Sequence, residues 1–222
     1  MPDSISPLQR NYSLPNDFVT LAKRHQPDAI FVMLGYIWQG YDQLRQQDRF
    51  KVSNVDNHLE DEITDALHAR IQDVMRQSDP YSPFAVVHQP LEGGLQKPGG
   101  RPPESDLGFR LRGGNVRSHF SVEAKVIRTD GAVSAYVKEV NENFLTYRYS
   151  TFSSQAAMLG YLLSGTDDKA FKAISAALGC KLRNCPAFPN REHRCSSHQR
   201  NPKAGSNMTN KFTCHHLILI FD

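Results

Sequence analysis

The stretch HFSVEAKVI, residues 119–127, decides the fold of this 222-residue chain. Apolar residues occupy every second position from Phe120 to Val126, which is the period of a β-strand with one face in the core. Two of the intervening polar positions are Glu123 and Lys125. Because residues two apart in a strand share a face, the carboxylate and the ammonium project into the same space.

A second predicted strand lies upstream and adds another carboxylate. Asp106 precedes an alternating run in which Leu107, Phe109 and Leu111 are apolar. We expect Asp106 and Glu123 to converge, and two such carboxylates are costly to keep ionised without a cation between them. Hard oxygen ligands suit Mg²⁺, and a lysine beside the metal can hold water, so the pattern predicts hydrolysis of phosphodiesters.

The acid-x-Lys tripeptide alone is weak support for this site. Asp167-Asp168-Lys169 has the same pattern but follows Gly165 in a polar turn, with no strand around it. Only the strand context of residues 123–125, together with Asp106, favours the catalytic interpretation.

Helices and strands alternate along the rest of the chain. Apolar spacing predicts helices in the first fifty residues, with an entry near 13–15, and over 57–77, 132–143, 153–163 and 168–178. Further strands are expected over 84–87, 144–151 and 212–221, with a Gly/Pro-rich loop at 90–104 and an irregular basic stretch at 180–211. The uniformly apolar end of the last strand predicts a place inside the sheet. We expect an α/β fold in which helices flank a central mixed sheet. A helical N-terminal extension (1–52) leads into this domain (53–222).

Composition favours a protein with one well-buried core that acts in the cytoplasm. Hydrophobic residues make up 39% and charged residues 22% of the chain, and no membrane span or secretory signal is predicted. Basic charge is concentrated in residues 97–128, with seven basic and three acidic side chains, and in 180–222, with seven and two. Sixteen of the 26 basic residues are arginines, which suit phosphate. The candidate nucleic-acid-binding residues are Arg110, Arg112, Arg194, His198 and Arg200.

Four cysteines raise the question of a zinc site near the C-terminus. Cys180, Cys185, Cys195 and His198 lie within nineteen residues, and Cys214 with His215 follows. No CxxC pair is present in this spacing, so we expect scattered thiols in and around a core and no stoichiometric zinc.

The arrangement resembles the PD-(D/E)XK nuclease superfamily, which has the restriction-endonuclease-like fold. In that family a helix leads into a mixed sheet, an Asp opens one strand and D/E-x-K occupies the next, here Asp106 and Glu123-Ala124-Lys125. Ser105 stands where the family's name has Pro. The resemblance covers about residues 57–165.

The resemblance implies a role for each matching residue. Asp106, Glu123 and the Ala124 carbonyl would ligate Mg²⁺, which Mn²⁺ could replace, and Lys125 would orient or activate the attacking water. The family's core helix often adds a Glu, for which Glu60 is the first choice and Glu62 the second. DNA is the expected substrate, cut to 3′-OH and 5′-phosphate ends.

A looser resemblance links this chain to small bacterial nucleases of antiviral defence and restriction. It rests on residues 196–200 and 214–221, and on Arg148-Tyr149 with residues 157–161. A nuclease acting on RNA or on a nucleotide, and a catalytically silent nucleic-acid-binding module, remain open alternatives. Control by a homodimer or by a partner defence protein is expected, and the helical segment 15–48, with Phe31 and Trp38, is the predicted contact surface.

Overall fold

A computed structural model describes residues 17–47, 58–92, 102–201 and 210–221. Its centre is a seven-stranded mixed sheet in the order β1-β2-β3-β4-β7-β6-β5. The strands are β1 (Phe84–His88), β2 (Leu107–Leu111), β3 (His119–Ile127), β4 (Gln155–Leu162), β5 (Arg183–Asn184), β6 (His193–Gln199) and β7 (Lys211–Ile220). The expected α/β class with a central mixed sheet is therefore confirmed.

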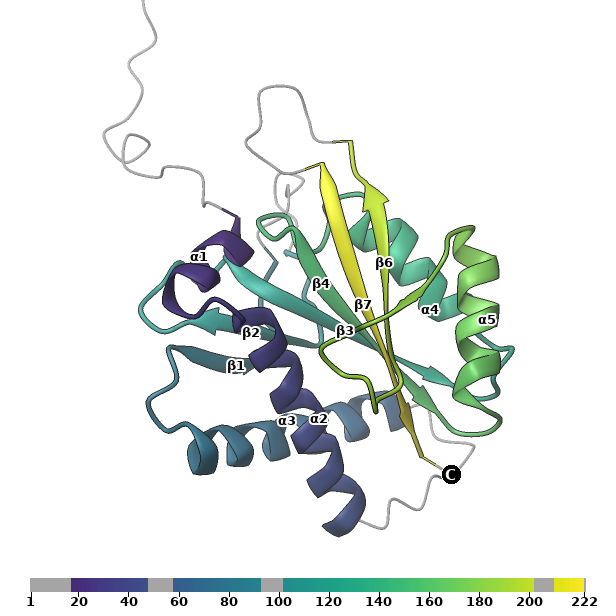
Figure 1. The fold of residues 1–222 in the computed structure, drawn as a ribbon, viewed down its shortest axis with the longest axis horizontal. Coiled ribbons are helices and arrows are strands. Elements are labelled where there is room, and N and C mark those ends of the chain that lie inside the picture. Colours follow the sequence, from purple (N-terminus) through teal and green to yellow (C-terminus); the bar gives the residue numbers. More distant parts are fainter. Residues whose placement is uncertain (1–16, 48–57, 93–101, 202–209, 222) are drawn as a thin grey trace, which may run out of the picture.

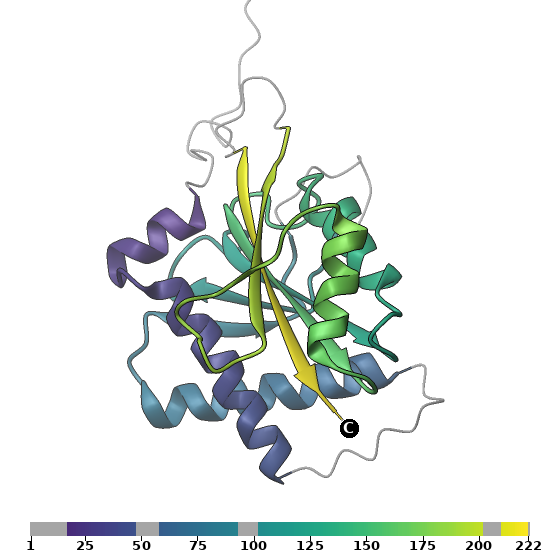
Figure 2. The same cartoon turned by 45° about the vertical axis from the view of Figure 1, so that its right-hand side comes forward.

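Helices cover both faces of the sheet (Figures 1 and 2). They are α1 (Phe18–His25), α2 (Ala29–Gln47), α3 (Leu59–Ser78), α4 (Ser134–Glu139), the π-helical turn η2 (Val140–Phe144) and α5 (Asp167–Leu178). One core cluster joins α1, α2 and α3 to one face, and a second joins α4, η2 and α5 to the other. Because α1 and α2 share the first cluster with the sheet, they are built into the core on which the predicted domain 53–222 depends.

The chain is parallel where β3, β4 and β7 meet and antiparallel on both sides of them. As predicted, the last strand lies inside the sheet, between β4 and β6. The core-facing residues of β3, among them Phe120, Val122 and Ala124, pack in the first cluster. Glu123 and Lys125 consequently project on the other side of the strand.

Three predictions of secondary structure were wrong. Most of the segment 153–163, predicted to be a helix, is strand β4 (Gln155–Leu162), because a central strand covered on both faces has no alternation to mark it. Gly160 in this strand lies so close to Ile127 and Ile218 that a Cβ atom would be 2.7 Å from each side chain. Residues 180–211, expected to be irregular, contain β5 and β6.

The third wrong prediction is the strand over 144–151. This segment continues from η2 into turns, and Tyr147 and Ser150 have φ values of 64° and 50°. Such left-handed conformations interrupt a strand whatever the aromatic content of the sequence. The predicted helix entry at 13–15 lies outside the described residues, and α1 is capped by Asp17, whose side chain accepts from the Thr20 N–H.

Candidate active site

The candidate site lies where β2 separates from β3. The pairing of these strands ends at Leu107 and Val122, so the following N–H groups on that edge of β3 have no β2 partner. Oδ2 of Asp106 accepts from the Ala124 N–H at 2.7 Å, and Oε2 of Glu60 accepts from the Val126 N–H at 3.0 Å. Two carboxylates from different elements thus replace the missing strand and satisfy its backbone donors.

Lys125 brings three oxygen atoms together at this edge. Its Nζ donates to Oε1 of Glu60 at 2.7 Å, to the Ala124 carbonyl at 2.8 Å and to Oε1 of Glu123 at 3.2 Å. The Glu123 side chain is only 5% exposed and that of Lys125 17%. The site therefore holds one cation among carboxylates that are largely shielded from water.

Burial controls the protonation of these groups. It raises the pKa of the Asp106 carboxyl to about 6, although Lys125 and the Ala124 N–H oppose the shift. Burial, followed by the charge of Asp106, raises the pKa of Glu123 well above its usual value. For Lys125, burial disfavours the ammonium, but Glu123 and Glu60 outweigh it and raise the pKa. The surroundings therefore keep Lys125 charged but make the carboxyl groups of Asp106 and Glu123 costly to ionise.

One carboxylate oxygen of this cluster could take a hard divalent cation as its partner. Oε2 of Glu123 is buried and has no hydrogen-bond partner among the described residues. A buried carboxylate oxygen of this kind is costly unless a cation or proton reaches it. Asp106 and Glu123 are the residues that could offer such a cation carboxylate oxygens, while the Ala124 carbonyl beside them accepts from Lys125.

The structure places Glu60, the first choice on the core helix, in contact with the site. It lies in the first turn of α3, whereas Glu62, the second choice, is exposed. Thr64, one turn further along, donates to the Glu60 carbonyl at 2.7 Å and lies 2.9 Å from the hydroxyl of Tyr161. The stripe of buried residues on α3 therefore fixes the rotation of the helix that points Glu60 at β3.

Two neighbours of Glu123 were missed by sequence reasoning. The charge of Glu139, at the end of α4, adds to the raised pKa of Glu123. Burial raises the pKa of Tyr149, and the charges of Glu123 and Glu139 raise it further. Glu139 also accepts a hydrogen bond from Asn143. Nothing in the sequence marks Glu139, because its approach depends on how α4 crosses the sheet.

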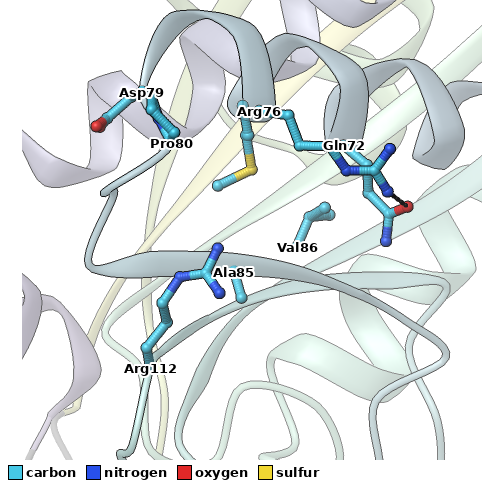
Figure 3. Close-up of a pocket in the computed structure, with 8 residues that line it drawn as sticks. Gln72, Arg76, Asp79, Pro80, Ala85, Val86 and Arg112 are labelled. Atoms are coloured by element: carbon cyan, nitrogen blue, oxygen red, sulfur yellow. Dashed lines mark hydrogen bonds between the residues drawn. The ribbon is translucent and has the colours of Figure 1, made fainter.

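The two predicted phosphate-binding arginines in and just after β2, Arg110 and Arg112, have different surroundings. Arg110 is exposed and pairs with His119 across β2 and β3, on the face that continues to Asp106 and Glu123. Arg112 donates to the Ser82 carbonyl at 3.0 Å. It lines a pocket of about 260 Å³ between the far half of α3 and β1, shown in Figure 3.

That pocket is separate from the candidate site. Besides Arg112 it is lined by Gln72, Met75, Arg76, Asp79, Pro80, Ala85 and Val86. Gln72 is twelve residues beyond Glu60, which is about 18 Å along a helix. The carboxylate cluster therefore does not open into this pocket.

The C-terminal basic residues do not form the expected common phosphate surface. The prediction for Arg200 is wrong, because the residue is 1% exposed and donates to the carbonyls of Phe144, Ser150 and Ser153. Arg194 donates to Asp168 at 3.1 Å. His198 is half-buried and lies 2.6 Å from the Ser196 hydroxyl. Each of these three residues would therefore have to break an existing contact in order to bind nucleic acid.

The predicted dimer surface on the N-terminal helices is largely internal. Trp38 is 3% exposed and contacts the His193 ring, while Phe31 remains 42% exposed. Within the described residues, no helix combines the length and apolar character needed to cross a bilayer.

No protein-family model matches this chain, and no curated protein or solved structure shows significant similarity to it.

Proposed function

We propose that this protein is a Mg²⁺-dependent endonuclease that hydrolyses DNA phosphodiester bonds in bacterial antiviral defence or restriction. One observation carries the proposal: Glu60 and Glu123 both accept from the Lys125 ammonium, and Asp106 accepts from the adjacent Ala124 N–H, at the edge of β3 that β2 leaves open. The helix that leads into the sheet, the Asp before one strand and the Glu-x-Lys in the next agree with the resemblance to PD-(D/E)XK nucleases.

Each residue has a role that follows from its position. Asp106 and Glu123 would hold Mg²⁺, which would lower the pKa of bound water and stabilise negative charge on a phosphate. Lys125 orients the attacking water and offsets charge on a phosphoryl oxygen. Glu60 fixes Lys125 through Oε1 while its Oε2 is held by the Val126 N–H, so it positions the ammonium.

The surface beside the carboxylates supports a polyanionic substrate. Arg110 and Arg117 are exposed and line a groove of about 390 Å³ together with His119. Arg110 lies on the same sheet face as Asp106, four residues along the strand, or about 13 Å. A nucleic-acid backbone that contacts these arginines can extend to the carboxylate site.

The test is a panel of nucleic acids and metals. Supercoiled plasmid, linear duplex DNA, single-stranded DNA and RNA are each incubated with Mg²⁺, Mn²⁺ or EDTA, beside an Asp106→Asn protein purified in parallel. We expect DNA cleavage with either metal and none with EDTA or the variant. Cleavage of RNA alone would contradict the DNA assignment, and binding without any cleavage would indicate a catalytically silent module.

A further inference from the structure

A second cluster of metal-binding side chains lies on the other face of the sheet. Cys185, His193, Cys195 and His215 each offer one ligand atom, and the four atoms all lie within 4.8 Å of one another. We propose that these residues bind one Zn²⁺ ion in a closed structural site, independent of the proposed nuclease chemistry.

Strand pairing brings the four residues together. Cys195 of β6 pairs directly with His215 of β7, and His193 lies two positions before Cys195 on the same face. Cys185 follows β5, and its backbone N–H donates to the His193 carbonyl at 3.0 Å. Two neighbouring strands and the residue that follows β5 therefore present the ligands, and the hydrogen-bond ladder of the sheet sets their positions.

The separations fit tetrahedral zinc. Nε2 of His193 is 3.1 Å from Nδ1 of His215, and Sγ of Cys195 is 3.3 Å from the same nitrogen. Zn–N bonds of about 2.1 Å and Zn–S bonds of about 2.3 Å place tetrahedral ligand atoms about 3.3 to 3.8 Å apart. The atoms of these two pairs therefore need to move apart by only a few tenths of an ångström to bind the ion.

The chemistry of the donors selects zinc. The charges of two thiolates offset that of a divalent cation and two neutral imidazoles add none, so the loaded site is neutral and can be buried without penalty for net charge. An S₂N₂ set in tetrahedral arrangement is typical of zinc, whereas Mg²⁺ prefers oxygen. Four protein ligands leave no open position, which is the property of a structural site.

The surroundings also fit a structural metal. Nε2 of His215 lies 3.0 Å from Oε1 of Gln155, the outer hydrogen bond that metal-bound histidines usually make. The rings of Phe31, Trp38 and Phe188 surround the two histidines, with Phe188 stacked on His193 at 5.0 Å. Cys185, His193 and His215 are buried and Cys195 is half-buried.

The ion would hold an edge of the sheet against α2. The loop from Cys185 to His193 carries Arg191, which forms an ion pair with Asp42 of α2 and lies 5.2 Å from the Trp38 ring centre. Zinc bound at both ends of this loop closes it, so metal binding contributes to the stability of β5, β6 and their contact with α2.

This ligand set differs from the one that spacing suggested. His198 is three positions after Cys195 and so projects from the opposite face of β6. Cys214, one position before His215, packs in the second core cluster, and Cys180 contacts that cluster. The expectation of scattered thiols thus describes Cys180 and Cys214 but not the other two cysteines.

Metal analysis tests the proposal directly. The full chain, produced in zinc-containing medium without a polyhistidine tag, should carry about one zinc per chain. Cys185→Ser and Cys195→Ser should each lose the zinc, whereas the matched controls Cys180→Ser and Cys214→Ser should keep it. Asp106→Asn should also keep it, which separates this site from the carboxylate site.

A second measurement does not depend on variants that fold. After zinc removal and Co²⁺ addition, the wild-type chain should show the intense visible bands of tetrahedral cobalt and thiolate-to-metal charge transfer. The single tryptophan, Trp38, should report loading by a change in fluorescence, since its ring centre is 6.3 Å from that of His193. Less than about 0.1 zinc per chain without a tetrahedral cobalt spectrum would overturn the proposal, as would another metal at full occupancy or zinc lost equally in Cys180→Ser.

Discussion

The Nζ atom of Lys125 lies 2.7 Å from Oε1 of Glu60, a residue 65 positions earlier in the chain. The other oxygen of the same carboxylate accepts from the Val126 backbone N–H. Glu60 therefore connects the first turn of α3 to both the backbone and the cation of β3. The position of the ammonium in the candidate site depends on how α3 packs against the sheet.

Glu60→Gln should lower cleavage by about 10- to 100-fold, the usual cost of removing a group that orients a metal or catalytic residue. Gln keeps an acceptor for the Val126 N–H but loses the charge that pairs with Lys125, so the fold should remain. Glu62→Gln, on the same helix but exposed, is the matched control. Cleavage rates and unfolding temperatures of both variants decide the matter, and a larger loss for Glu62→Gln would show that the wrong helix face has been assigned.

Asp106 should make stability depend on pH in a defined direction. Its pKa is raised to about 6 in the folded state, so the folded chain holds this proton more tightly than the unfolded chain. The resulting stabilisation is present at low pH and is lost as the pH rises through about 6. Asp106→Asn should therefore unfold at a higher temperature than wild type near pH 8, and the difference should shrink toward pH 4.

Asp168→Asn is a control for which we expect the opposite dependence of stability on pH. Hydrogen bonds from Lys172 and Arg194 lower the pKa of Asp168, so its contribution is present at neutral pH and is lost as the pH falls. This variant should unfold below wild type near pH 8. If the unfolding temperatures of Asp106→Asn and wild type differed by the same amount from pH 4 to pH 8, the pKa of the Asp106 carboxyl would not be shifted.

Arg110 should contribute one phosphate contact. Arg110→Ala should weaken DNA binding in low salt and reduce the slope of log affinity against log salt by about 1. Arg24→Ala, an exposed residue of α1, should leave the slope unchanged. Binding isotherms of an Asp106→Asn background at several salt concentrations avoid cleavage during the measurement, and an unaltered slope for Arg110→Ala would place the nucleic acid elsewhere.

Arg200 should matter for folding and not for binding. Its guanidinium is buried, donates to three backbone carbonyls and lies 4.2 Å from the Tyr147 ring centre and 4.3 Å from that of Phe212. Arg200→Met should cost about 3 kcal/mol of unfolding free energy, because it leaves buried carbonyls without donors. Denaturant unfolding measures this loss, and a stable variant with a smaller salt slope for DNA binding would instead restore the predicted phosphate contact.

The sequence was informative where local pattern and tertiary environment agree. Alternation in residues 119–127 predicted β3 because one face of that strand meets the core and the other carries Glu123 and Lys125. The run at 155–162 has no such contrast, since β4 is buried between β3 and β7 and covered on both faces. Its helix-like composition was overridden by strand pairing, which no local window contains.

The same distinction between local pattern and tertiary contact applies to the residues of the carboxylate site and of the Cys/His cluster. Glu60 could be selected because its spacing from Ile63 and Leu67 places it beside a buried stripe on α3. Glu139 and the four Cys/His residues could not be grouped, since their approach depends on how α4 crosses the sheet and on the register of β6 with β7. A fixed register also explains why Cys195 joins His193 and His215 and not His198.

The rate of Mg²⁺-dependent plasmid cleavage by Lys125→Ala tests the central claim most directly. Lys169→Ala is the matched control, because Asp167-Asp168-Lys169 repeats the acid-x-Lys pattern at the exposed start of α5. Wild type and Lys169→Ala should cut equally well, and Lys125→Ala should be about 10²- to 10³-fold slower, with unchanged DNA affinity. Wild-type cleavage by Lys125→Ala, or no metal-dependent cleavage by the wild-type protein, would contradict the account.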